Sequence, residues 1–165
     1  MGLFSFIKEA GSKVLGFGKN ITEEASEKNE KRAQEEQDKN ERVARKLEHT
    51  IHDLDLKIDE LSIHIEDDMA VVSGKAGDQA NREKIILAVG NTEGISQVDD
   101  RMDVEDGEPE AVFHTVETGD DLEKIAGKHY GDPAKYKLIF EANKPMLKDP
   151  KKIYPGQVLR IPPEE

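Results

Sequence analysis

Two histidines near the middle of the chain have the type and spacing from which a metal site can be built. His49 and His52 lie three residues apart in a segment with helical periodicity, and Asp53 and Asp55 follow them. Imidazole nitrogens and carboxylates are common ligands of zinc. Because this spacing fixes no third ligand, we interpret both histidines as surface residues and keep a transition-metal site as the alternative.

An acidic cluster further along the chain offers carboxylate oxygens, which calcium prefers. Its members are Asp99, Asp100, Asp103 and Asp106, and it lacks the glycine and the terminal glutamate of a calcium-binding loop. Gly74-Lys75 is not preceded by a phosphate-binding loop, and the sequence has no cysteine and no Gly-x-Ser-x-Gly pattern. We therefore expect a protein that is not an enzyme.

The composition narrows the class of partner. The chain has 165 residues, a formal net charge of −12, 36% charged residues and 35% hydrophobic residues. Nucleic acids and anionic membranes both select basic surfaces, so this charge argues against either as the main partner. The length fits one or two small domains. The high share of charged residues indicates that some segment has no hydrophobic core of its own.

Residues 1–19 have an apolar front but neither a long apolar core nor a small-residue cleavage pattern. Phe6 stands where a myristoylation motif requires a hydroxyl residue. We therefore expect no secretory signal and a cytoplasmic location. Apolar residues follow a helical stripe, interrupted at Gly11, through Leu3, Phe4, Ile7, Ala10, Val14 and Leu15. We predict an amphipathic segment that packs on the next domain, with binding to a membrane surface as the alternative.

Residues 20–42 form a charged run with few apolar side chains and no helix breaker. Opposite charges recur four residues apart, as in Glu24 with Lys28 and Glu35 with Lys39. Each such pair supports an isolated helix by only about 0.2–0.5 kcal/mol. We expect a charged helical insertion or linker that joins no core.

Residues 43–105 alternate between helical and strand periodicities. Apolar residues at helical spacing mark a first helix through Val43, Leu47, Ile51 and Leu54. A hairpin follows over 61–74, a second helix over 79–89 and a third strand region over 95–104. The order α-β-β-α-β, with Val-x-Ser-Gly after the hairpin and Gly-Ile-x-x-Val-Asp after the second helix, resembles a BON domain. Residues 106–111 are interpreted as a linker.

The periodicity of apolar residues over 112–163 predicts the order β-α-α-β. Asp120 or Asp121 is suited to cap the first helix, and Gly131-Asp132-Pro133 ends it. The string Val116-x-x-Gly119-Asp120-x-Leu122 and the string Ile153-x-Pro155-Gly156-Gln157-x-Leu159 together resemble a LysM domain.

The LysM resemblance implies an association with polymers of N-acetylglucosamine. It places a glycan groove between residues 118–121 and residues 143–154, and Asp121 stands where the family usually carries a hydroxyl residue. His114 and His129 fall at positions that this fold leaves variable.

A BON domain followed by a LysM domain, behind the N-terminal segment, resembles one family of small cytoplasmic bacterial potassium-binding proteins. The expected fold class is therefore α+β. The resemblance implies that the ligand is K⁺ and that the chain is an ion sensor or buffer, and we expect a monomer with no nucleic-acid or membrane partner. We leave open whether ion binding changes the arrangement of the domains and whether a protein acts downstream. A binder of peptidoglycan-type glycans and a protein scaffold remain the alternatives.

Potassium is large and weakly hydrated, so a ring of neutral carbonyl oxygens can replace its water shell. Carbonyls become available where helices end, and the sequence offers such ends at 10–12 and at 90–95. From the residue types alone, we would interpret both segments as ordinary helix ends without a bound ion. The family resemblance, however, points to the same two segments as the ion site. The ligands that it implies are the carbonyls of Ile7, Ala10, Ser12, Gly90, Thr92 and Ile95.

Overall fold

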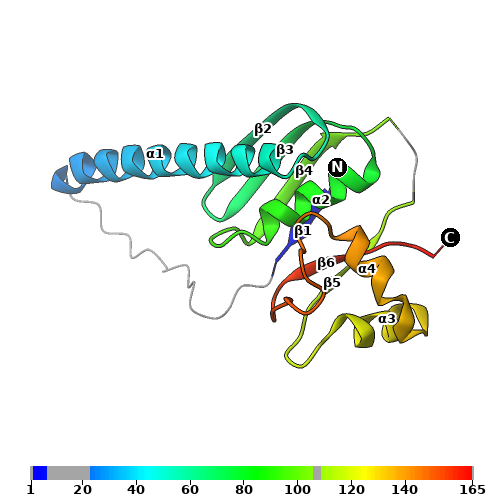
Figure 1. The fold of residues 1–165 in the computed structure, drawn as a ribbon. Coiled ribbons are helices and arrows are strands. Elements are labelled where there is room, and N and C mark those ends of the chain that lie inside the picture. Colours follow the sequence, from blue (N-terminus) through cyan, green and yellow to red (C-terminus); the bar gives the residue numbers. More distant parts are fainter. Residues whose placement is uncertain (1, 7–22, 106–108, 165) are drawn as a thin grey trace.

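The computed structural model of the chain describes residues 2–6, 23–105 and 109–164. Within these residues the strands form two sheets, a four-stranded sheet in the order β1-β4-β3-β2 and a two-stranded sheet of β5 and β6 (Figure 1). The elements are β1 (Gly2–Ser5), α1 (Glu23–Asp53), β2 (Ile58–Glu66), β3 (Met69–Ala76), α2 (Gln79–Gly90), β4 (Gln97–Asp103), β5 (Val112–Thr115), α3 (Leu122–Tyr130), the 3₁₀ turn η1 (Pro133–Lys135), α4 (Tyr136–Ala142) and β6 (Val158–Ile161). The chain thus has the predicted α+β class.

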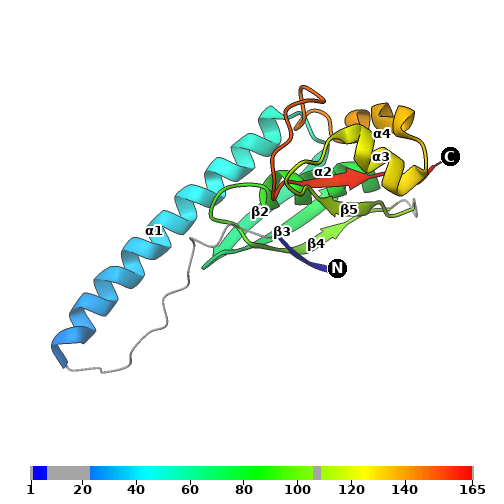
Figure 2. The ribbon, with the colours of Figure 1, turned by 90° about the horizontal axis from the view of Figure 1, so that it is seen from below.

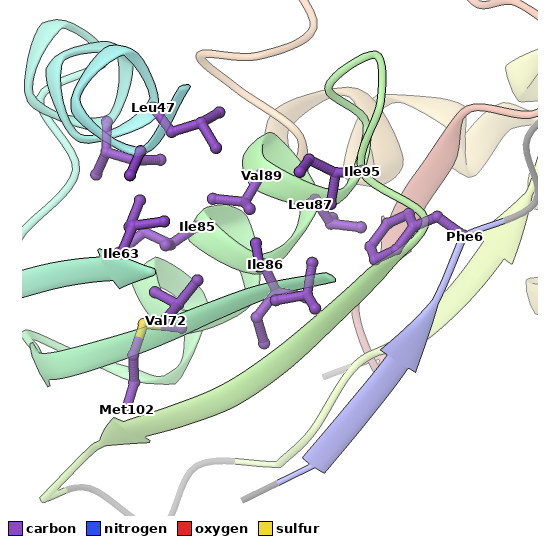
Figure 3. Packing of buried hydrophobic residues seen from close by; sticks show 14 of the residues in the cluster. Phe6, Leu47, Ile63, Val72, Ile85, Ile86, Leu87, Val89, Ile95 and Met102 are labelled. Carbon is purple, nitrogen blue, oxygen red and sulfur yellow. The ribbon is translucent and has the colours of Figure 1, made fainter. Parts of the chain in front are cut away.

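The first domain comprises β1 to β4 with α1 and α2. Strands β2 and β3 form an antiparallel hairpin, and α2 connects β3 to its parallel neighbour β4. Figure 3 shows Leu47 of α1 and Ile85 of α2 pointing toward Ile63 and Val72 of the sheet. All four side chains are buried, and their contacts hold both helices to the sheet.

Residues 2–5 form a strand, and the predicted helical stripe is wrong for Leu3 and Phe4. β1 runs antiparallel to β4, with Gly2 opposite Asp100 and Ser5 opposite Gln97. The edge of β4 supplies hydrogen-bond partners for this short strand, and a period of two turns Phe4 and Phe6 to the same face. Phe6 is buried in the core of the first domain. The other members of the stripe, from Ile7 to Leu15, lie outside the described residues.

The charged run does not end before the first domain begins. It continues into the helix that packs on the sheet, so α1 is one helix of 31 residues. Ala44, Leu47 and Ile51 are buried at its C-terminal end, whereas residues 30–39 are exposed. Its N-terminal half extends away from the sheet (Figures 1 and 2). No described helix is long and apolar enough to cross a membrane.

The second domain comprises the β5–β6 sheet with α3 and α4. Of the two predicted caps, Asp121 is the N-cap of α3, where its carboxylate accepts a hydrogen bond from the Lys124 amide at 2.7 Å. Gly131 ends the helix with a φ of 73°, a left-handed conformation that glycine adopts without steric cost. Ile125, Ile139 and Leu159 are fully buried between the helices and the sheet.

Two asparagine side chains complete the outer edge of β6. Asn91, which follows α2, donates to the Val158 carbonyl at 2.9 Å and accepts from the Val158 amide at 2.8 Å. Asn143, which follows α4, makes the same two bonds with Arg160, each at 2.8 Å. An open strand edge leaves backbone groups unpaired, and here one amide from each domain satisfies them.

An ion pair and an aromatic contact extend this interface between the domains. Arg160 Nε lies 3.1 Å from Glu83 Oε1, and the other oxygen of Glu83 accepts from the Ala111 amide at 2.9 Å. Glu83 is 3% exposed, so its charge depends on these partners. The rings of Phe4 and Phe113 lie 5.3 Å apart. Figure 2 shows the resulting arrangement, with β6 beside α2.

We predict that Asn91→Ala weakens the attachment of the second domain to α2. The substitution leaves the amide and carbonyl of Val158 without their partners, at a cost of about 1–3 kcal/mol for each group that stays buried. Urea unfolding followed by amide exchange should then show β6 opening before the four-stranded sheet. Asn40→Ala removes one longer bond, at 3.4 Å, within the first domain and is the control. Identical unfolding curves for the parent and Asn91→Ala would contradict the prediction.

Candidate functional site

The loop that follows α2 contains three of the six predicted carbonyl ligands. Gly90 is the last residue of α2, and Thr92 and Ile95 lie between α2 and β4. The Thr92 amide donates to the Val89 carbonyl at 3.1 Å, and the Ile95 amide donates to the Thr92 carbonyl at 3.2 Å. These bonds close the loop into a tight turn, in which Gly94 has a φ of 90°.

Gly90 is required for a close approach and not for a backbone turn. Its φ lies outside the left-handed region, but a Cβ atom at this position would lie 1.9 Å from Cζ of Phe6. The ring of Phe6 therefore packs directly against the backbone at the end of α2 (Figure 3). At the other end of the loop, Gly94 has a left-handed φ and does allow a backbone turn.

Phe6 fixes the start of the N-terminal segment beside this loop. Its amide donates to the Ser96 carbonyl at 2.7 Å, and its side chain is 4% exposed. The predicted ligands Ile7, Ala10 and Ser12 follow directly in the chain but lie outside the described residues. The structure thus anchors residue 6 at the loop of Gly90, Thr92 and Ile95.

The electrostatics at this end of α2 favour a cation. The last turn of a helix carries about half an elementary negative charge on its carbonyls. Within α2 itself no basic side chain lies in that turn. On the far side of the loop, the carbonyl of Asp68 accepts from the Ser96 amide at 2.8 Å, and the Asp68 carboxylate accepts from the Ser96 hydroxyl. These bonds tie the loop to the hairpin turn between β2 and β3.

An open cleft of about 400 Å³ separates the two domains next to this loop. Leu54, Ala88 and Thr92 line it from the first domain, and Met146, Lys152 and Tyr154 line it from the second. The last three belong to residues 143–154, one of the two loops assigned to the glycan groove by resemblance. That loop therefore faces the first domain. In the other loop, an oxygen of Asp121 is engaged as a helix cap.

The histidines and the aspartate considered as metal ligands from the sequence do not come together as a metal site in the structure. His49 and Asp53 are exposed, with His49 Nδ1 and Asp53 Oδ1 3.7 Å apart, and His52 is exposed as well. Among the residues that the structure describes, no group of three or more His, Asp or Glu side chains could hold a metal ion.

Asp100 of the acidic cluster has a structural role. It is fully buried, its Oδ2 lies 2.6 Å from Arg82 Nη2, and its Oδ1 accepts from the Met102 amide at 2.9 Å. Asp99 pairs with Arg101 at 3.0 Å, and Asp103 is exposed. Asp106 lies outside the described residues. A buried carboxylate that is paired in this way is not available to a calcium ion, and loss of its partner would leave an uncompensated buried charge.

Sequence reasoning did not identify Asn91, Phe6 or the contact of His114 with His129. Asn91 follows a helix, where asparagine is a common residue, so its bond to a strand 67 residues away has no local signal. The pattern around Phe6 fitted a helical stripe. His114 and His129 come from different elements, and their rings meet only in the folded domain.

Comparison with known proteins supports the two modules. Residues 38–106 match the BON domain family, and residues 114–162 match the LysM domain family. The chain is 41% identical over 164 residues to the potassium binding protein Kbp of Escherichia coli O6:H1, covering 99% of this chain and 100% of that protein.

Two further relatives match over shorter stretches. An uncharacterized protein of Deinococcus radiodurans is 49% identical over 49 residues, which cover 30% of this chain and 19% of the relative. The uncharacterized protein YqbP of Bacillus subtilis is 43% identical over 58 residues, which cover 30% of this chain and 26% of the relative.

We predict that Gly90→Ala displaces Phe6 and destabilises the first domain. Overpacking of this kind costs about 1–3 kcal/mol, more than the gain in helix propensity from glycine to alanine. The measurement is the free energy of unfolding in urea.

The matched background is Phe6→Ala, which removes the ring. In the Phe6→Ala background, Gly90→Ala should leave the free energy of unfolding unchanged or raise it, because the clash with the ring is gone. A cost for Gly90→Ala that is the same with and without the Phe6 ring would contradict the close contact.

Proposed function

The chain belongs to the family of the potassium binding protein Kbp, and on this premise we propose that it binds K⁺ through main-chain carbonyl oxygens. The proposed ligands are the carbonyls of Ile7, Ala10, Ser12, Gly90, Thr92 and Ile95. The observation that carries the proposal is the anchoring of Phe6 against Gly90 and Ser96. This contact holds the chain immediately before Ile7 at the loop that supplies the other three carbonyls.

Carbonyl ligation fits the physical chemistry of the ion better than carboxylate ligation. K⁺ gives up its water shell readily, and neutral dipoles can replace that shell. Carboxylates are harder ligands and favour small or divalent cations. The many acidic groups of the chain raise the local concentration of any cation. Selectivity for K⁺ would then come from the loop and not from the net charge.

A loop that is already ordered loses less conformational entropy when an ion binds. The Thr92 hydroxyl donates to the Ala88 carbonyl at 2.8 Å, and the Asn91 amide donates to the Leu87 carbonyl at 2.9 Å. These bonds hold the residues of the loop in place before the ion arrives.

The same loop contacts the second domain, which gives ion binding a route to the domain arrangement. Asn91 lies between the proposed ligands Gly90 and Thr92 and makes two bonds to Val158 of β6. A shift of the loop backbone on binding would therefore change the strength of this attachment. An ion-dependent interface would suit a sensor, whereas a fixed interface would suit a buffer.

We further propose that the chain acts in the cytoplasm as a monomeric binding protein without enzymatic activity. The net charge of −12 disfavours nucleic acid and anionic membrane as partners. Glycan binding through the LysM module is less well supported. The carboxylate of Asp121 caps α3, and the 143–154 loop lines the cleft with the first domain.

We predict that K⁺ raises the melting temperature of the full chain more than Na⁺ or choline does at the same ionic strength. A ligand that binds only the folded state stabilises it by about 2.7 kcal/mol at a hundredfold excess over its dissociation constant. Differential scanning calorimetry in the three chloride salts measures the difference. Equal melting temperatures in all three salts would contradict K⁺ binding.

We predict that Glu93→Gln leaves the K⁺-dependent stabilisation unchanged. Glu93 is an exposed carboxylate inside the loop, and carbonyl ligation does not require its charge. The comparison is the difference in melting temperature between KCl and choline chloride for each protein. Loss of that difference in Glu93→Gln would assign the ion to a carboxylate instead.

A further inference from the structure

Two histidine rings of the second domain meet outside the loop described above. His114 lies on β5 and His129 on α3. His114 Nδ1 and His129 Nε2 are 3.1 Å apart, and the rings meet edge to face at an interplanar angle of 89°. The side chain of His114 is 9% exposed, whereas His129 is exposed. One ring is therefore held by the domain, and the other can turn in solvent.

Asp120 determines which nitrogen of His114 carries the proton. Its Oδ2 lies 3.1 Å from His114 Nε2 and also accepts from the Glu117 amide at 3.0 Å. An ionised carboxylate can only accept hydrogen bonds. His114 therefore donates from Nε2, and the lone pair of its Nδ1 points toward His129.

A neutral His129 imidazole has one unprotonated nitrogen, which can supply a second lone pair. Nε2 of His129 lies at hydrogen-bond distance from Nδ1 of His114. In the tautomer of His129 that carries its proton on Nδ1, both of these facing nitrogens have a lone pair.

We propose that His114 and His129 bind one divalent transition-metal ion of the zinc, copper or nickel class. Two nitrogens that are 3.1 Å apart and each about 2.0–2.1 Å from one ion subtend an angle of about 98° at that ion. This lies between the angles of square-planar and tetrahedral coordination. A carboxylate that accepts from the other nitrogen of a ligating histidine orients the ring and raises its basicity, which is the position of Asp120.

The surroundings set the expected strength of the site. The chain supplies two ligands, and water completes the coordination, because no third His, Asp or Glu joins the pair among the described residues. Asp120 contributes a negative charge, and Lys128 opposes the ion. Glu117 and Asp121 are exposed nearby in sequence, and Lys124 lies 3.9 Å from Asp121. The site is open to solvent at His129 and should exchange its ion with the solution.

Zinc chloride titrated into the full chain at constant KCl, followed by calorimetry near neutral pH, tests the proposal. One equivalent of Zn²⁺ should bind, and His129→Gln should weaken this binding at least tenfold. Because His129 is exposed, this variant keeps the fold, and far-ultraviolet circular dichroism checks that. Asp120→Asn should weaken binding by about 10–100-fold through the loss of the oriented, more basic ring.

His49→Gln is the matched control, since His49 is an exposed helical histidine beside a carboxylate that lies 3.7 Å away. It should bind Zn²⁺ as the parent does. Absence of Zn²⁺ binding by the parent, or equal binding by the parent and His129→Gln, would mean that the two rings form only an imidazole hydrogen bond. Because KCl is constant, either result is independent of the K⁺ proposal.

Discussion

The outer edge of β6 needs hydrogen-bond partners, and the arrangement of the two domains depends on how it obtains them. A two-stranded sheet leaves one row of amides and carbonyls open on each strand. Asn143 satisfies this row at Arg160 from within the second domain, and Asn91 satisfies it at Val158 from the first. Since Asn91 stands at the end of α2, the same few residues connect the second domain, the helix terminus and Phe6.

On the side of the first domain, this junction requires a residue without a side chain at position 90. The Phe6 ring occupies the space that a Cβ would need, and the Phe6 amide is bonded to Ser96. Residue 6 is therefore held next to the negative end of α2. The proposed ion site uses this junction, which lies at the negative end of the α2 dipole.

Much of the fold could be predicted from local patterns in the sequence. The strand periodicity over 61–74 predicted the β2–β3 hairpin. Asp120 or Asp121 and Gly131 marked the ends of α3, because these signals act over a few residues. The strand at residues 2–5 could not be predicted from local patterns, because it forms by pairing with β4, which lies far along the chain. Three of the six candidate ligands lie together in one loop, but the contacts of Asn91 and of His114 depend on tertiary packing.

The location of the ion can be measured directly in the full chain. Amide chemical shifts in an isotope-labelled sample would be followed while KCl replaces choline chloride at constant ionic strength. Carbonyl ligation predicts that the largest saturable shifts fall on amides within 8–13 and 91–96, because each amide shares a peptide group with the carbonyl of the residue before it. Shifts confined to the charged residues of α1, or shifts that do not saturate, would contradict the claim that backbone carbonyls bind K⁺.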